Sequence, residues 1–349
     1  MSRHKSYNKL PTYQEGFHNE SLCKSMVFSS FGKTGLEVSL LGLGTSELAL
    51  VYNTPEEENG IQTVVNAIKS GINYIDTAPY YGQGKAEIVL GKALKHIPRN
   101  TYYLATKVAR YGAEPQNMCD FSGSLALKSF DESLQRLGVD YIDIIQVHDV
   151  EFAKDADIVA NEILPALQKL KDMGKVKFIG ITGYPLTRLK EVLEKSTVHV
   201  DIVLSYCRCT LFDNSLKEYI PFFKEKNLAI INAAVLGMGL LTHNGPQDWH
   251  PVGPEIKEAC KQAAQYCKEQ NVNIAKLAAC YSFSQPDIDV HLIGMQNEKL
   301  LEANLKSVNE GLSPHEEQVK QKIIEKYFKN LTKTHWENVE LMSFHIHKD

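Results

Sequence analysis

Eight short apolar segments alternate with helical patterns along most of the chain, and this alternation is the feature that most limits its fold. The segments cover residues 40–44, 72–76, 103–107, 142–148, 178–182, 202–205, 229–232 and 290–294. Several of them are continuous runs of Val, Ile and Leu, which is typical of parallel strands that are covered on both faces. A regular order of strand and helix predicts a parallel α/β fold.

Helical patterns fill the intervals between these segments. Thr54, Pro55, Glu56 and Glu57 resemble a capping box with proline at the first helical position. The apolar residues that follow keep helical spacing as far as Gly71, which favours the end of a helix. Further helices are expected from about residue 86 and over 124–137, 157–173, 187–195, 214–226, 255–270, 274–283 and 299–307.

Two architectures contain such an alternation, and the first strand distinguishes them. An open doubly wound sheet that binds a dinucleotide carries a G-x-G-x-x-G turn directly after its first strand. The stretch from Leu41 to Gly44 supplies only the first two glycines, and Thr45 follows. Eight parallel strands also close a barrel naturally. We therefore predict a (β/α)8 TIM barrel.

The remaining segments complete the predicted organisation. Residues 26–31 and 36–38 flank a Gly-Lys-Thr-Gly turn and predict a β-hairpin that closes the bottom of the barrel. We expect residues 1–25 to form an irregular N-terminal arm, residues 26–331 a single barrel domain and residues 332–349 a C-terminal tail. A length of 349 residues suits one large α/β domain or two smaller ones.

Composition argues against several classes of protein. A net charge of -4 leaves no basic footprint for nucleic acid. No apolar run approaches the roughly 20 residues that a membrane-spanning helix needs, and the N-terminus lacks the apolar core of a secretory signal. The seven cysteines are scattered and include no C-x-x-C pair, so we expect no metal site. A reducing, cytoplasmic setting fits this cysteine usage best.

The stretch INYIDTAPYYGQGKAE, residues 72–87, has the character of one corner of an active site. Its strand ends in Asp76, and Tyr81 follows in the loop. Lys107 and His148 end the next two predicted strands. Catalytic groups of a barrel lie at the C-terminal ends of its strands, so all four side chains are expected to converge. Each residue alone is as readily explained by a structural role, and their joint placement is what favours a site.

These four residue types suit one kind of chemistry. Tyrosine is a weak acid with a pKa of roughly 10, and a neighbouring ammonium lowers that pKa. We predict that Lys107 supplies the ammonium, that Asp76 holds Lys107 and that His148 orients a substrate oxygen. A Tyr–Lys pair without a nucleophilic Ser or Cys suits proton delivery to a carbonyl that receives a hydride.

From about Phe28 to Ser307 the chain resembles the aldo-keto reductase superfamily. The similarity lies in FGKTGLEVSLLGLGT, NYIDTAPYYGQGKAEIVLGKAL, LATKV, DIIQVHD, GKVKFIGIT, GMGLLT and IGMQNEKLLEANL. The resemblance implies a barrel, a nicotinamide cofactor and a catalytic tetrad of Asp76, Tyr81, Lys107 and His148. It also implies an enzyme that interconverts a small-molecule carbonyl and its alcohol, with Tyr81 as general acid and base.

The resemblance further implies a cofactor site, although several positions depart from the family pattern. Thr182 and Gly183 stand in place of the Ser-Asn pair that usually holds the nicotinamide carboxamide, and Ser205 stands in place of a Gln. Ala233 replaces the Tyr that many members stack on the nicotinamide. The rest of the cofactor would meet Leu236, Gly237, Met238, Gly239, Gly294, Met295, Gln296, Lys299 and Asn304.

The choice between NADP and NAD rests on few residues. Superfamily members often bind the 2′-phosphate of NADP with an Arg, but this chain has no Arg after Arg208. Lys299 or Lys306 would have to take that role, and Lys299 is equally compatible with a solvated helix position. We expect NADP(H) to be preferred and NAD(H) to be possible, with modest discrimination because a single ammonium lacks the fork of an Arg.

Within the superfamily the chain is most similar to a branch that includes L-galactose dehydrogenase and insect reductases of 3-oxo-ecdysteroids. The similarity is carried by GITGYPL, LSYC, NAAVLGMGLLT and the Trp-His-Pro triplet at 249–251. It implies an aldehyde, a sugar or a steroid ketone as substrate, with an NAD-dependent sugar dehydrogenase as the alternative.

Loops form the pocket walls of this family, here residues 47–53, 111–120, 243–254 and the tail after 331. Tyr111 and Trp249 are therefore candidate substrate contacts. Trp249 is equally compatible with stacking on a substrate face and with packing its own loop.

Two functions from other classes stay open. A regulatory subunit would keep the fold and the cofactor without significant turnover, and a carbohydrate-binding barrel would bind no cofactor at all. The intact tetrad favours an enzyme over both. Nothing in the sequence indicates an oligomeric state.

Overall fold

The computed structural model of the chain describes residues 3–49 and 57–348. Thr54, Pro55 and Glu56 of the predicted capping box, and residues 50–53 of one predicted pocket loop, lie outside the described residues.

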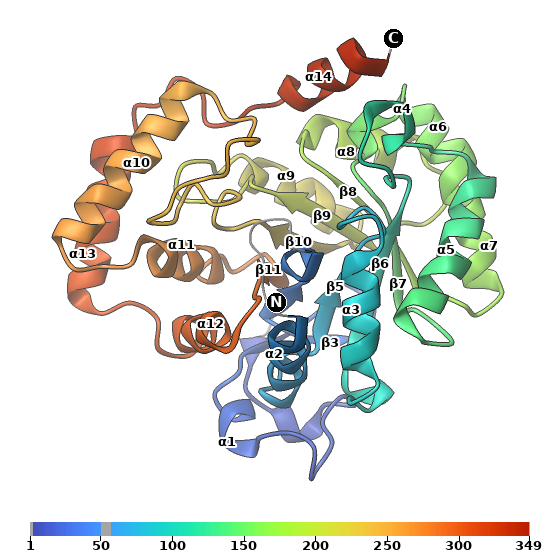
Figure 1. Ribbon diagram of the computed structural model, residues 1–349, viewed down its shortest axis with the longest axis horizontal. Coiled ribbons are helices and arrows are strands. Elements are labelled where there is room, and N and C mark those ends of the chain that lie inside the picture. Colours follow the sequence, from blue (N-terminus) through green and yellow to red (C-terminus); the bar gives the residue numbers. More distant parts are fainter. Residues whose placement is uncertain (1–2, 50–56, 349) are drawn as a thin grey trace.

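Eight parallel strands close into a barrel in the order β10-β11-β4-β5-β6-β7-β8-β9, which confirms the predicted (β/α)8 fold (Figure 1). The strands are β4 (Leu41–Gly44), β5 (Tyr74–Asp76), β6 (Tyr103–Val108), β7 (Ile144–Val147), β8 (Phe178–Gly183), β9 (Ile202–Tyr206), β10 (Ala229–Ala233) and β11 (Val290–Gly294).

Side chains alternate across the barrel wall and thereby build two cores. On β6, Leu104 packs against the surrounding helices, whereas Ala105 faces the barrel interior with Ile144 and Leu292. This inward and outward alternation is the rule for barrel strands. The interior is a packed core and not a pore, so ligands have access only at the ends of the strands.

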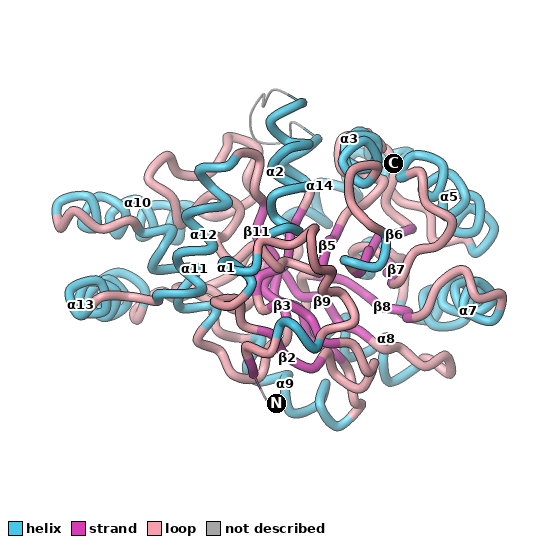
Figure 2. The backbone as a smooth tube through the Cα atoms, turned by 90° about the horizontal axis from the view of Figure 1, so that it is seen from below, coloured by secondary structure: helices cyan, strands magenta, loops and turns pink. Residues whose placement is uncertain are grey.

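The N-terminal hairpin closes the lower end of the barrel, as predicted. Its strands β2 (Phe28–Ser30) and β3 (Glu37–Ser39) pair antiparallel, and Figure 2 shows them lying across the barrel strands. Phe31 enters the barrel and meets Tyr74 edge-on, with ring centroids 5.4 Å apart. Gly32 has a φ of +53° and lies directly against the backbone of Ala229, where a side chain would not fit.

The arm that the sequence predicts to be irregular carries three short ordered elements. They are β1 (Arg3–His4), η1 (Tyr7–Lys9) and α1 (Glu20–Cys23). β1 pairs with β2 and extends the hairpin into a three-stranded sheet. Tyr7, Leu10 and Cys23 are buried against the barrel core, and this apolar contact accounts for the order. The division of the chain into arm, barrel and tail stays a prediction.

Helices surround the barrel close to their predicted positions. They are α2 (Glu57–Lys69), α3 (Lys85–Leu94), α4 (Pro115–Met118), α5 (Gly123–Leu137), α6 (Ala156–Ile158), α7 (Leu164–Asp172), α8 (Leu186–Lys195), α9 (Leu216–Glu225), α10 (Pro254–Glu269), α11 (Ile274–Phe283) and α12 (Glu298–Glu310). The single helix predicted over 157–173 is interrupted by a π-turn at Val159–Ile163. Pro165 follows that turn and lacks the N–H that an uninterrupted helix would use.

The C-terminal part contains elements that the sequence does not predict. They are α13 (Pro314–Ile323), a π-turn at Ile324–Phe328 and α14 (Val339–Lys348). Within residues 3–49 and 57–348 we find no helix with the length and apolar character of a membrane span.

Candidate active site

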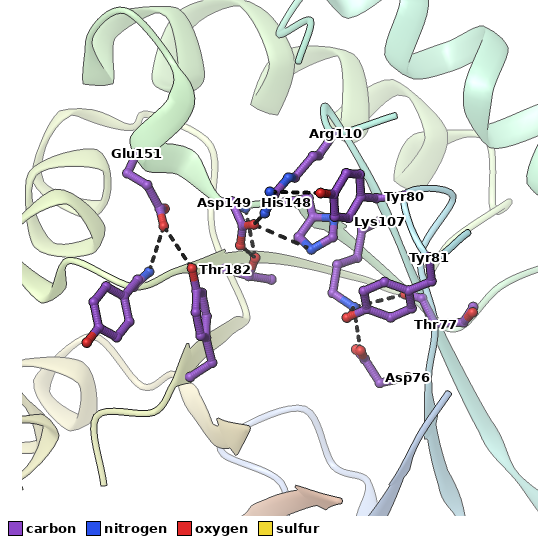
Figure 3. Close-up of polar contacts among 12 residues, drawn as sticks. Asp76, Thr77, Tyr80, Tyr81, Lys107, Arg110, His148, Asp149, Glu151 and Thr182 are labelled. Atoms are coloured by element: carbon purple, nitrogen blue, oxygen red, sulfur yellow. Dashed lines mark hydrogen bonds and ion pairs between the residues drawn. The ribbon is translucent and has the colours of Figure 1, made fainter. Parts of the chain in front are cut away.

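The four predicted catalytic residues meet at the C-terminal ends of three neighbouring strands (Figure 3). Asp76 is the last residue of β5, and Lys107 lies near the end of β6. Tyr81 stands in the turn before α3. His148 follows β7 directly, one position beyond its last residue Val147. The structure thus brings together every member of the predicted tetrad.

Lys107 is the centre of the hydrogen-bond network. Its ammonium donates to the carboxylate of Asp76, to the carbonyl oxygen of Thr77 at 2.9 Å and to the hydroxyl of Tyr81 at 3.1 Å. The side chain is only 1% exposed. Burial alone would lower the pKa of Lys107, but Asp76 and Tyr81 raise it above its ordinary value. The ammonium therefore stays charged at neutral pH, directly beside the phenol.

Two opposing influences act on the pKa of Tyr81. Lys107 does lower the pKa of Tyr81, but burial raises that pKa by more, so the net change is upward. The lowering influence predicted for Lys107 is present, but desolvation disfavours the phenolate more than the ammonium favours it. As a consequence Tyr81 keeps its proton at neutral pH and can act as a proton donor.

His148 is held as a neutral imidazole. Burial lowers the pKa of His148 to about 3, and the nearby cations Lys107 and Arg110 lower it as well, although Asp149 opposes them. Its ring meets the edges of Tyr80 and Tyr81, with centroids 5.9 and 5.8 Å apart. Its Nδ1 has no hydrogen-bond partner among the described residues. A neutral ring with a free nitrogen suits the predicted role of orienting a substrate oxygen.

This state of His148 predicts a specific pH dependence of stability. As the pH falls below about 6.5, an imidazole in the unfolded chain takes up a proton, whereas folded His148 resists protonation down to about pH 3. The unfolded state binds more protons in this window, so stability falls with pH. We expect His148→Gln to reduce the loss of unfolding free energy between about pH 7 and about pH 4, as measured by urea denaturation. His243→Gln removes an exposed imidazole as a control, and equal effects of both substitutions would contradict a buried neutral ring.

Further polar residues support the tetrad, and the sequence analysis missed them. Gln146 of β7 donates from its amide to the second oxygen of Asp76 at 2.8 Å. Arg110 forms a buried ion pair with Asp149, next to His148, and donates to the hydroxyl of Tyr80 at 3.1 Å. Asp149 is adjacent to His148 in the QVHD stretch, which was the one available signal. No sequence signal pointed to Gln146 or Arg110, because the residues that they contact lie far away in the sequence.

The predicted cofactor residues lie around the opposite half of the same barrel mouth. Thr182 and Gly183 end β8, Ser205 lies in β9 and Gly294 ends β11. Leu236, Gly237, Met238 and Gly239 form the loop after β10, and Met295, Gln296, Lys299 and Asn304 follow β11 into α12. Asn304 lies in the middle of α12, away from its first turn, and the cofactor roles of all these residues stay a prediction.

Several of these side chains already hydrogen-bond to other residues of the chain or are buried away from solvent. The hydroxyl of Thr182 accepts from the backbone N–H of Asp149 at 2.9 Å, and the amide of Asn304 donates to Leu300 within its own helix. Met295 is fully buried. Ser205 Oγ and Gln296 Oε1, by contrast, are buried without a partner in the described part of the chain. Such orphaned polar atoms on this side of the mouth fit a polar ligand such as a nicotinamide dinucleotide.

The two candidate substrate contacts differ in their setting. Tyr111 lies in the loop after β6, where its backbone N–H donates to Met118 at 2.6 Å. Trp249 lies in the loop after β10, is 52% exposed and stacks on His250 with centroids 6.2 Å apart. One face of Trp249 therefore packs its own loop. No group of His, Cys, Asp and Glu side chains in the described ranges could hold a metal ion.

Known proteins share both the sequence and the architecture of this chain. Residues 40–325 match the sequence profile of the Aldo/keto reductase family. L-galactose dehydrogenase of Arabidopsis thaliana is 44% identical over 80% of this chain and 88% of its own length. D-arabinose 1-dehydrogenase of Saccharomyces cerevisiae is 37% identical over 71% of this chain and 76% of its own length. The holo form of an aldo-keto reductase from Bacillus halodurans superposes with a TM-score of 0.67, at 26% identity over 85% of this chain and 95% of that structure.

Proposed function

This chain belongs to the aldo/keto reductase family and is an oxidoreductase that uses a nicotinamide cofactor, and we propose that it interconverts a sugar and its oxidised form with Tyr81 as the proton-transferring residue. One observation carries the assignment of Tyr81: its hydroxyl lies 3.1 Å from the charged Lys107 ammonium. The phenol holds its proton at neutral pH, and the ammonium is in place to stabilise the phenolate once the proton leaves.

The other three residues take supporting roles in this proposal. The cofactor, when bound, supplies or accepts a hydride at the substrate carbon. Tyr81 gives a proton to the substrate oxygen in reduction and removes it in oxidation. His148, as a neutral ring, hydrogen-bonds the same oxygen and excludes other orientations. Asp76, fixed by Gln146, holds Lys107 so that its charge stays against the phenol.

The residues of the opposite half of the mouth would hold the cofactor. We assign the nicotinamide end to Thr182, Gly183 and Ser205, the last with an unpartnered hydroxyl. The pyrophosphate would meet the loop from Leu236 to Gly239, where Gly237, Met238 and Gly239 all have positive φ. The adenosine end would meet Gly294, Met295, Gln296, Lys299 and Asn304 at the start of α12, where helix N–H groups favour an anion.

A sugar is the substrate class that the relatives favour. The relatives that are 44% and 37% identical carry the names L-galactose dehydrogenase and D-arabinose 1-dehydrogenase. Both names describe oxidation of a monosaccharide, and we therefore rank a sugar above the aldehyde and steroid ketone that the sequence also admits. We further propose a cytoplasmic location, which fits the free thiols of all seven cysteines.

Cofactor titration followed by turnover tests this function. Quenching of tryptophan and tyrosine fluorescence by NADPH and NADH measures binding, and absorbance of the reduced cofactor measures oxidation of L-galactose and D-arabinose. We expect binding and turnover. Binding without any turnover would indicate the regulatory alternative, and absence of binding would indicate a carbohydrate-binding barrel.

Preference between the two cofactors is a separate prediction. Lys299 is exposed near the N-terminus of α12, and we propose that it gives NADPH a modest advantage over NADH. Neighbouring Glu298 opposes that advantage, because its carboxylate occupies the first turn of the same helix. We expect Lys299→Ala to weaken NADPH binding by about 1 kcal/mol, the scale of a hydrogen bond to a charged group, and to leave NADH unchanged. Equal losses for both cofactors would show that Lys299 does not reach a 2′-phosphate.

A further inference from the structure

The C-terminal tail runs across the mouth of the barrel and is anchored first at Trp336. The indole is buried and stacks on Tyr184, with ring centroids 5.0 Å apart and planes inclined by 21°. It also meets His250 edge-on at 4.9 Å. The backbone N–H of Trp336 donates to the hydroxyl of Tyr184 at 3.0 Å. Tyr184 follows β8 and His250 follows β10, so this anchor lies on the cofactor side of the mouth.

A second anchor lies on the side of the tetrad. Phe344 of α14 packs edge-on against Phe152, with centroids 5.2 Å apart. Phe152 ends the short helix Val150–Phe152 that follows His148 and Asp149. The guanidinium of Arg110 lies over the same Phe152 ring at 4.7 Å. In agreement, α14 packs against α4, which follows β6, and Figure 1 shows the two helices side by side.

Glu340 lies between these anchors on the inner face of α14. Val339 and Met342 are 45% and 63% exposed and mark the outer face of the helix. Glu340 and Phe344 are four residues apart and thus share the opposite face. Glu340 is close enough to Arg110 and Asp149 to interact with both electrostatically, and burial raises the pKa of its carboxyl above the ordinary value. Within the described part of the chain, Glu340 has no hydrogen bond and no ion pair of its own.

We propose that Glu340 is a specificity-determining residue that accepts hydrogen bonds from substrate hydroxyls and disfavours anionic substrates. This inference rests on the proposed function and deepens it, since it narrows the substrate to a neutral polyhydroxylated molecule. The two terminal nitrogens of Arg110 are occupied by Asp149 and by the hydroxyl of Tyr80, and Arg110 forms no ion pair with Glu340. Since no described residue donates to Glu340, a substrate hydroxyl can supply a donor to its carboxylate.

Charge at the mouth supports the same conclusion. Lys107 balances Asp76, and Arg110 balances Asp149. Glu340 forms no ion pair among the described residues, so its carboxylate is not compensated as the other two are. A carboxylate on the substrate would be repelled at this distance in a partly buried setting.

Three substrates and two variants test the proposal. The substrates are a neutral aldose, the uronic acid of the same configuration, and benzaldehyde as an apolar carbonyl without hydroxyls. Glu340→Gln removes the charge and keeps the shape. Met342→Gln, on the outer face of the same helix, is the matched control. Thermal unfolding of both variants verifies that the barrel is intact.

We expect Glu340→Gln to lower kcat/KM for the aldose by about tenfold, the effect of losing one charged hydrogen bond. In the same variant, kcat/KM for the uronic acid should rise relative to kcat/KM for the aldose, and kcat/KM for benzaldehyde should change by less than about twofold. Met342→Gln should match the wild type on all three substrates. Equal changes for all three substrates, or a wild type that uses the uronic acid as well as the aldose, would overturn the role of Glu340. A wild type that turns over none of the three would overturn the proposed function and this inference together.

Discussion

Replacing Tyr81 by Phe is expected to lower kcat by a factor of about 10²–10⁴, the usual contribution of a positioned general acid. The Tyr81 oxygen accepts from the charged Lys107 ammonium at 3.1 Å, so its own O–H is the acidic proton of the tetrad that can be donated to a substrate. Phenylalanine keeps the ring that packs against His148, so the fold and the cofactor site should be preserved. Steady-state rates on the sugar, together with the NADPH and NADH titrations, measure both properties.

The neighbouring tyrosine offers a matched control. Tyr80→Phe also removes one phenolic hydroxyl, but that hydroxyl accepts from Arg110 and does not touch Lys107. We expect Tyr80→Phe to retain most of the activity. A Tyr81→Phe protein that keeps most of the wild-type kcat, or a Tyr80→Phe protein that loses as much, would remove Tyr81 from the proposed mechanism.

The second large effect is expected at Lys107. Lys107→Met removes the main influence that lowers the pKa of Tyr81. The effect of burial, which raises this pKa, is then no longer opposed by the ammonium. Sugar oxidation needs the phenolate, so the pH at which its rate reaches half of the maximum should move upward. The substitution also leaves Asp76 as an unpaired buried charge, which typically costs about 3–5 kcal/mol of stability.

A double variant separates these two consequences of losing Lys107. Lys107→Met with Asp76→Asn removes both charges and should recover most of the lost stability, because no unpaired ion is then buried. It should not recover the activity or the position of the pH profile, because the ammonium beside Tyr81 is still absent. Recovery of both in the double variant would mean that Lys107 acts only by neutralising Asp76. An unchanged pH profile in a folded Lys107→Met protein would contradict the electrostatic coupling itself.

The position of the tetrad was predictable from the sequence because Asp76, Lys107 and His148 mark the ends of apolar runs and Tyr81 follows one of these ends in its loop. Strand ends converge in a barrel, so the position of Lys107 in LATKV was sufficient to place it near Asp76. The net direction in which the pKa of Tyr81 shifts was not predictable in this way. It depends on how deeply the phenol is buried, and burial is a property of the assembled loops.

The supporting residues and the tail mark the limit of sequence reasoning. Gln146 and Arg110 act through partners on other strands, and no local pattern indicates such pairings. Glu340 and Phe344 lie in a short helix that follows a polar segment, and its stability comes from contact with Phe152 rather than from helix propensity. The order of the N-terminal arm also comes from tertiary contact, because Tyr7 and Cys23 are buried against the barrel. In the sequence they are isolated apolar residues in a polar stretch, so no pattern predicts this contact.

Closure of the barrel has a consequence for synthesis of the chain on the ribosome. The first barrel strand, β4, forms hydrogen bonds with the last, β11, so Leu41 must wait until His291 has left the exit tunnel before it finds its partner. During that interval the outer edges of β4 and of the latest strand to emerge stay unpaired, and such edges are sites of aggregation. The anchors of the tail are made later still. A nascent chain released before residue 294 would therefore expose two open edges, and we expect chaperones that shield apolar strands to engage this protein until translation is nearly complete.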